Sequence, residues 1–131
     1  MFYVFPITIP ANTPDTAKLK TILPVTAGTV KRVMVEFPAG HVGLTHLHIN
    51  RGLAQVWPTN PDASFKSSNE TIEWAEEYVL DTPPYQLEAY AWNEDDTYDH
   101  TITVRLELAA LVVVKSLVGE IKSLFGMGGA A

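Results

Sequence analysis

The stretch Thr29–Phe37, with the sequence TVKRVMVEF, carries the clearest strand signal in the chain. Its side chains alternate, and β-branched residues, which sheets favour, are frequent in it. One face is expected to carry Val30, Arg32, Met34 and Glu36, and the other Lys31, Val33, Val35 and Phe37. This pattern predicts a β-strand with one face on a core.

Short segments of similar character continue on both sides of this strand, separated by many of the nine prolines and eight glycines. Further strands are expected at residues 2–9, 17–23, 44–50, 53–57, 70–74, 77–80, 85–92 and 100–108. In the last of them, the inward residues are expected to be Ile102, Val104, Leu106 and Leu108. Turn signals about every 8–12 residues, without intervening helices, are typical of an antiparallel sandwich or barrel. We therefore predict an all-β domain of about eight strands.

Composition and charge exclude several classes of protein. A chain of 131 residues fits one domain, and its apolar content of 47% is enough for a core. The net charge of −6 and nine scattered basic residues argue against nucleic-acid binding. Because cysteine is absent, no disulfide, zinc-thiolate site or thiol catalysis is expected. The longest apolar run, residues 108–114, is too short for a membrane span, and the N-terminus lacks the basic start of a signal peptide.

The C-terminal segment has a different period. Apolar residues recur with a 4-3 spacing, which is typical of one face of a helix. They are Leu111, Val114, Val118, Ile121 and Phe125. A lone helix of this length is only marginally stable in water, so we expect its apolar face to pack against another chain. The expected organisation is an extended arm or edge strand at 1–12, a sandwich at 13–109, an amphipathic helix at 110–126 and a flexible tail at 127–131.

The sharpest local motif is Gly40-x5-His46-x-His48. Residues two apart on a strand share a face, so both imidazoles can approach one metal ion. The spacing resembles the first metal-binding motif of cupins, which are jelly-roll proteins, and His100 is a candidate third ligand. That resemblance also implies a glutamate shortly after the second histidine, whereas residues 49–53 are INRGL. We favour two histidines at a surface or a subunit interface, and no cofactor.

Other polar and aromatic clusters each have an ordinary structural explanation. The acidic run 93–99 offers oxygen ligands for Ca²⁺, but it lacks the ordered spacing of a calcium loop. Glu73, Glu76 and Glu77 offer carboxylates for glycoside hydrolysis, but they also suit a charged edge strand. The three tryptophans and five tyrosines are spread over many segments, which suits core and interface packing better than a sugar-binding surface. No catalytic residue is predicted.

Several longer patterns extend the comparison with known families. They are the turn Phe37-Pro38-x-Gly40-x-x-Gly43-Leu44, the loop Trp57-Pro58-Thr59-Asn60-Pro61 and the segment Ala91-Trp92-Asn93-Glu94-Asp95-Asp96. With the proline-punctuated N-terminal arm, the chain resembles the jelly-roll decoration (cement) proteins of tailed-bacteriophage capsids, especially of thermophilic phages.

The resemblance implies a single antiparallel jelly-roll sandwich in a virion, as a homotrimer or other symmetric multimer on a major capsid protein. The terminal segments are the expected assembly interface, with Phe2, Tyr3, Val4 and Phe5 from the arm and the apolar stripe from the helix. Two alternatives stay open. One is a cupin-like metal-binding protein or enzyme that uses His46 and His48, and the other is a carbohydrate-binding module.

Overall fold

The computed structural model describes residues 1–111 of the chain. Eight strands and one short 3-10 helix form this part. In chain order they are β1 (Phe2–Ile9), η1 (Asp15–Ala17), β2 (Leu19–Pro24), β3 (Gly28–Phe37), β4 (Thr45–Arg51), β5 (Ala54–Trp57), β6 (Glu70–Leu80), β7 (Gln86–Asn93) and β8 (His100–Ala110). The prediction of an all-β chain with about eight strands is confirmed for these residues.

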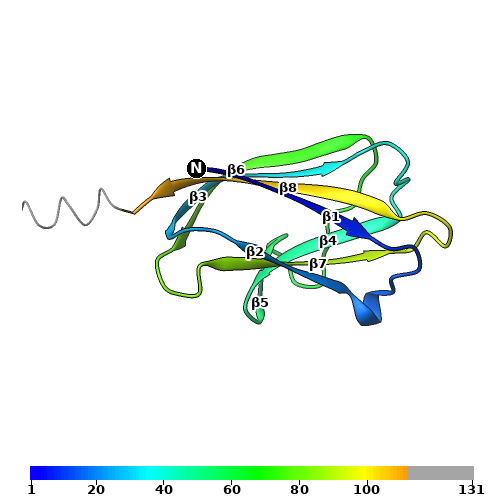
Figure 1. Ribbon diagram of the computed structural model, residues 1–131, viewed down its shortest axis with the longest axis horizontal. Coiled ribbons are helices and arrows are strands. Elements are labelled where there is room, and N and C mark those ends of the chain that lie inside the picture. Colours follow the sequence, from blue (N-terminus) through cyan, green and yellow to red (C-terminus); the bar gives the residue numbers. More distant parts are fainter. Residues whose placement is uncertain (112–131) are drawn as a thin grey trace, which may run out of the picture.

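The strands form two four-stranded antiparallel sheets, with the orders β1-β8-β3-β6 and β2-β7-β4-β5. Figure 1 shows them as two layers, so the domain is a β-sandwich. The pairing is nested: β1 pairs with β8, β2 with β7, β3 with β6 and β4 with β5. Elements distant in sequence therefore hold one another in place.

The core lies between the two sheets and is built by the inward residues of nearly every strand. The four inward residues predicted for the last strand, Ile102, Val104, Leu106 and Leu108, are all buried. Phe37, Leu47 and Leu87 are among the largest side chains with no exposed surface. No helix long and apolar enough to cross a membrane occurs among residues 1–111.

One face assignment in β3 was wrong. The register of β3 shifts between Val30 and Arg32 against both of its neighbours, which is a β-bulge. The extra residue reverses the alternation, so Val30 is buried together with Val33, Val35 and Phe37. Arg32 stays on the outer face, where it bonds to Glu73.

Two predicted boundaries also change. The segments expected at 70–74 and 77–80 are one continuous strand, β6. Ala110, expected to open the helix, is the last residue of β8 and lies opposite Gly28. The rest of that helix beyond Leu111, and the tail at 127–131, lie outside the described residues.

The N-terminal segment is an edge strand in this domain. All of β1, from Phe2 to Ile9, pairs with β8, so the segment is already used within its own sheet. Figure 1 shows β1 running alongside β8, with the N-terminus near the end of β8. Of the two forms expected for residues 1–12, an arm or an edge strand, residues 2–9 adopt the second.

Candidate functional site

The outer face of the second sheet carries a row of stacked rings formed by His46, His48, Tyr90 and Trp92, here called the ring ladder. His46 lies opposite Trp92 in the register of β4 and β7, and His48 lies opposite Tyr90. The His46 and Trp92 ring centroids are 4.6 Å apart with an interplanar angle of 1°, and those of His48 and Tyr90 are 5.3 Å apart. Directly opposed residues on neighbouring strands are spaced to stack in this way.

His46 connects two loops through its ring nitrogens. Its Nε2 lies 2.7 Å from Glu94 Oε2, and its Nδ1 lies 3.0 Å from Ser64 Oγ. Because a carboxylate only accepts, Nε2–H donates to Glu94, and in the neutral imidazole the Ser64 hydroxyl donates to Nδ1. Both bonds join segments far apart in sequence, so this contact was missed at the sequence level.

The order Ser64–His46–Glu94 resembles the hydrogen-bond relay of serine hydrolases, and its chemistry depends on what surrounds the hydroxyl. Such enzymes need amide donors that stabilise an oxyanion. The amides that flank Ser64 are already used: Ala63 N donates to Asn60 O at 3.3 Å and Phe65 N to Leu47 O at 2.8 Å. The relay fixes the 58–69 loop on β4, and the two flanking amides supply no free oxyanion donor.

His48 is held as a neutral imidazole. Lys18 Nζ lies 3.2 Å from its Nε2, and Asn50 Oδ1 lies 2.8 Å from its Nδ1. An ammonium can only donate, so Nε2 accepts and the proton resides on Nδ1. Burial and then the Lys18 charge lower the pKa of His48, and they outweigh the opposing hydrogen bond to Asn50. Lys18 Nζ also lies 4.8 Å from the centre of the Trp92 ring, within cation–π range.

These contacts are unfavourable for a metal ion at the candidate pair His46 and His48. A metal would have to displace Ser64 or Glu94 from His46, and Asn50 or Lys18 from His48. The Lys18 ammonium would also repel a cation beside His48. Within residues 1–111, no three or more His, Cys, Asp or Glu side chains are placed to hold one metal ion.

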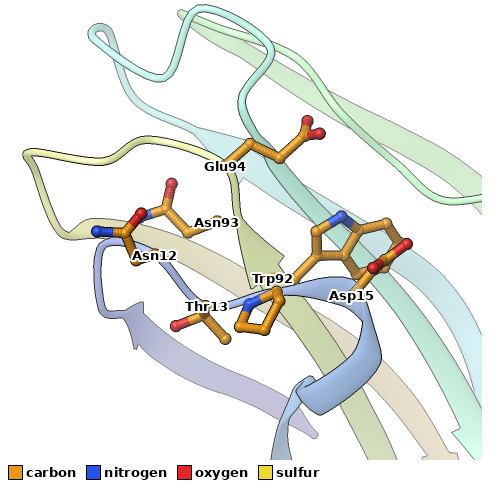
Figure 2. Close-up of a pocket in the computed structure, with 7 residues that line it drawn as sticks. Asn12, Thr13, Asp15, Trp92, Asn93 and Glu94 are labelled. Carbon is orange, nitrogen blue, oxygen red and sulfur yellow. The ribbon is translucent and has the colours of Figure 1, made fainter.

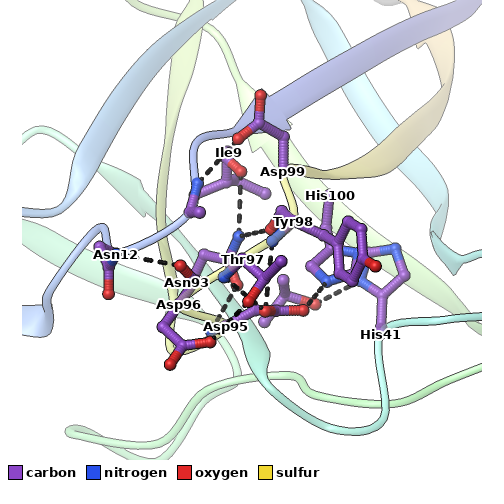
Figure 3. Close-up of polar contacts among 12 residues, drawn as sticks. Ile9, Asn12, His41, Asn93, Asp95, Asp96, Thr97, Tyr98, Asp99 and His100 are labelled. Atoms are coloured by element: carbon purple, nitrogen blue, oxygen red, sulfur yellow. Dashed lines mark hydrogen bonds and ion pairs between the residues drawn. The ribbon is translucent and has the colours of Figure 1, made fainter.

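The third candidate ligand, His100, belongs to a different cluster. It begins β8 in the other sheet, where its Nε2–H donates to Asp95 Oδ2 over 2.8 Å. Its ring lies 4.5 Å from that of His41, and Figure 3 shows these side chains together. The structure thus brings His46 and His48 onto one face but joins His100 to His41 and Asp95.

His41 is the most enclosed of the four histidines. Its side chain is buried, its Nδ1 bonds to Thr45 Oγ1, and its ring meets Phe37 edge-on at 5.7 Å. Burial and then the charge of His100 lower the pKa of His41, against a hydrogen bond with the Thr101 backbone. We assign it a structural role as a neutral side chain.

The acidic run forms an internally bonded loop. Asp95 Oδ1 accepts from the amides of Thr97 and Tyr98 at 2.9 and 3.2 Å. The hydrogen bond from His100, and then these backbone bonds, lower the pKa of Asp95. The Asn93 amide group donates to Ile9 O and Tyr98 O at 3.1 and 3.0 Å (Figure 3). Several of the oxygens that Ca²⁺ would need are thus already used.

Each of the three candidate hydrolytic glutamates also has a structural partner. Glu73 pairs with Arg32, and Glu77 pairs with Lys31. Burial would raise the pKa of Glu76, but hydrogen bonds from Trp74 and Trp57 lower it overall. Both indoles donate to the same Glu76 oxygen, at 2.9 and 2.8 Å. The glutamates of β6 therefore anchor side chains.

A shallow pocket of about 310 Å³ lies where the 12–15 segment meets the end of β7. Figure 2 shows its lining residues, which include Trp92, Asp15 and Glu94. A sugar platform needs an open aromatic face, whereas the Trp92 ring is stacked against His46 and has the Lys18 ammonium over it. Trp57 is buried in the core and packs against Trp74, so these indoles form no platform beside Trp92.

The predicted assembly residues of β1 divide by face. Phe2 and Val4 are exposed, at 55% and 51%. Tyr3 and Phe5 are half-buried against the core and stack with a 6.0 Å centroid spacing. Of the predicted helix stripe, Leu111 is half-buried, and Val114, Val118, Ile121 and Phe125 lie outside the described residues.

Comparison with protein-family models, with curated proteins and with solved structures finds no match to this chain.

Proposed function

We propose that this protein is a non-enzymatic structural subunit of a virus particle, either a capsid decoration (cement) protein or a minor capsid subunit. The observation that carries the proposal is the nested pairing of β1 with β8, β2 with β7, β3 with β6 and β4 with β5. A long antiparallel ribbon of eight strands gives this pairing when it wraps into two sheets, which is the topology of a jelly roll.

Jelly rolls serve viral capsids, lectins and cupins, so the choice among them rests on side chains. The cupin alternative requires free histidine nitrogens, but those of His46 and His48 are hydrogen-bonded and face Lys18 and Glu94. The lectin alternative requires open aromatic faces, but Trp92 and Tyr90 are stacked on imidazoles. A building block requires neither feature.

The proposed partners are further copies of the chain and a major capsid protein. The resemblance in the sequence favours a homotrimer located in the virion. Exposed Phe2 and Val4 on β1 and the apolar stripe from Leu111 onward supply the contacts. No cofactor is required.

Mass spectrometry of gradient-purified particles from the source culture tests the proposal directly. The chain should co-migrate with the major shell protein at a fixed ratio, and its gene should lie near capsid, portal or terminase genes. A gene within a metabolic operon, together with absence from particles, would overturn the proposal.

Metal analysis distinguishes the proposed structural role from the cupin alternative. Under the structural role, we expect protein purified without chelator to contain substoichiometric transition metal, at a level unchanged by His46→Ala, because the ring nitrogens already have partners. Asn60→Ala, on an exposed loop, is the matched control. Stoichiometric metal that His46→Ala alone removes would restore the cupin assignment.

A further inference from the structure

The outer edge of β1 is the least protected sheet edge in the described domain. The other edge strands are β6, β2 and β5. β6 carries four glutamates, β2 carries Lys20, and β5 has only four residues. β1, with the sequence FYVFPITI, has eight residues and no charge. Proteins normally protect exposed edges with charge, proline or shortness. β1 has only Pro6, so its apolar edge before Pro6 suits a partner strand.

The hydrogen bonds to β8 establish which backbone groups of β1 are free. Met1 and Leu108 exchange both main-chain bonds, at 2.6 and 2.7 Å. In an antiparallel ladder, the N–H and C=O groups of alternate residues point to the same neighbouring strand, so those of the odd-numbered residues of β1 point to β8. The N–H and C=O groups of the even-numbered residues, from Phe2 to Thr8, point away from β8, to the open edge of the sheet. Pro6, which has no N–H, belongs to this outward set, as proline in an edge strand should.

The outward groups form one short segment that can bind another backbone. Phe2 and Val4 each present an N–H and a C=O, whereas Pro6 presents only a C=O. If a partner strand continued alongside Pro6, its carbonyl group would face the proline ring in place of an N–H donor. Pairing is therefore favourable only around Phe2 and Val4, whose side chains are also exposed.

We propose that this edge binds the same edge of a second copy, antiparallel, across a two-fold axis at Tyr3. Phe2 then lies opposite the partner's Val4, and each pair exchanges both main-chain bonds. Among the registers that keep Pro6 unpaired, this one pairs the largest number of β1 residues with β1 of the second copy. It also places apolar side chains beside each other without like charges.

This inference deepens the proposed function, because it names one contact through which the subunit assembles. The contact is isologous, so it joins two copies into one continuous sheet. If another surface forms trimers, the β1 contact joins those trimers in pairs. In either case, loss of the β1 contact should halve the mass of the oligomer that the purified chain forms in solution.

The substitution Val4→Pro tests the contact in the full chain. The Val4 N–H faces away from β8, so proline removes the donor for the partner and leaves the domain's own ladder intact. Thr8→Pro is the matched control, because it removes an outward N–H of the same strand outside the paired segment. We expect light scattering to show that Val4→Pro halves the mass and Thr8→Pro retains it. A wild-type monomer or lone trimer, or an unchanged mass in Val4→Pro, would overturn the inference.

Disulfide trapping tests the register and covers the case in which Val4→Pro fails to fold. The chain has no cysteine, so Phe2→Cys and Val4→Cys each introduce a single thiol. Opposed Cα atoms in a hydrogen-bonded pair lie about 5.5 Å apart, which suits a disulfide, and diagonal neighbours lie about 7–8 Å apart. Mixing the two variants should therefore give cross-linked dimers, and each alone should give few. Absence of cross-links in the mixture, or equal yields in all three samples, would contradict the register.

These results are separable from the test of the proposed function. Association with virus particles is measured on particles, whereas the β1 contact is measured on the purified chain. Failure of the β1 contact would leave the virion assignment standing, and absence from particles would leave the edge pairing standing.

Discussion

The four histidines of this domain act as cross-links between segments. His46 joins the 58–69 loop to Glu94, His48 joins Lys18 to Asn50, and His100 bonds to Asp95. His41 fills the space between Phe37 and His100. Lys18 and Glu94 reach His48 and His46 across 30 and 48 residues of sequence, so sequence patterns identified these histidines but not their distant partners. His-x-His on a strand predicted a shared face correctly. On that face, the two imidazoles stack with Trp92 and Tyr90 of β7.

The lowered pKa of His41 predicts a loss of stability in acid. Its ordinary value is 6.5, and burial beside His100 lowers it in the folded domain. Between the two values the unfolded chain binds more protons, so the free energy of unfolding falls as the pH falls below about 6.5. His48 acts in the same direction. Melting temperatures should be nearly constant from pH 8 to 7 and should decline from pH 6.5 to 5.

His41→Asn identifies the source of this decline. The variant should melt at a lower temperature than the wild type at pH 7.5, because a buried ring is lost. Its further loss between pH 6.5 and 5 should be smaller, because one titrating group is absent. A decline as steep as that of the wild type would assign the pH dependence to other groups.

At the scale of elements, alternation located most strands because each has one buried and one exposed face. It failed where neighbouring strands decide the geometry. The bulge at Val30–Arg32 shifts the register of β3 against both of its neighbours, β6 and β8, and no residue within TVKRVMVEF indicates it. Likewise, an apolar N-terminal segment serves equally as an arm or an edge strand, and its pairing with β8, about 100 residues away, decides between them.

The start of β3 supplies a test at this scale. Gly28 lies between Leu80 of β6 and Ala110 of β8, and a β-carbon there would clash with the Ala109 carbonyl oxygen. The clash involves backbone, so Gly28→Ala should cost about 3 kcal/mol, the upper range for overpacking. Thermal or urea unfolding would measure it.

Gly52→Ala is the matched control for the added methyl group. No atom lies within 4 Å of its β-carbon, and only its positive φ of 61° opposes the substitution. We expect a cost of about 1 kcal/mol there. Equal costs at the two positions would show that β3 and β8 separate easily at this end.

For the whole molecule, nested pairing makes the first and last described strands neighbours in one sheet. The buried core extends from Ile7 to Leu108. All-β class, an approximate strand number and most inward residues followed from local patterns. Sheet order, the ring ladder and the free β1 edge depend on which distant strands meet, and periodicity does not contain that information. We therefore expect residues 1–111 to fold without the C-terminal segment.

Deletion of residues 112–131 tests that implication together with the assembly role predicted for the apolar stripe. Because residues 1–111 bury a core between their own two sheets, the shortened chain should lose less than about 1 kcal/mol of stability, seen as a melting shift of a few degrees. If the stripe binds a second copy, the deletion reduces the number of chains per assembly. Val118→Asp in the full chain does so too, because the contact would bury an unpaired charge. Ser116→Asp, on the polar side of the predicted helix, should leave the number of chains unchanged. An unchanged number of chains after deletion would contradict self-assembly through the stripe and leave the β1 edge as the contact between copies.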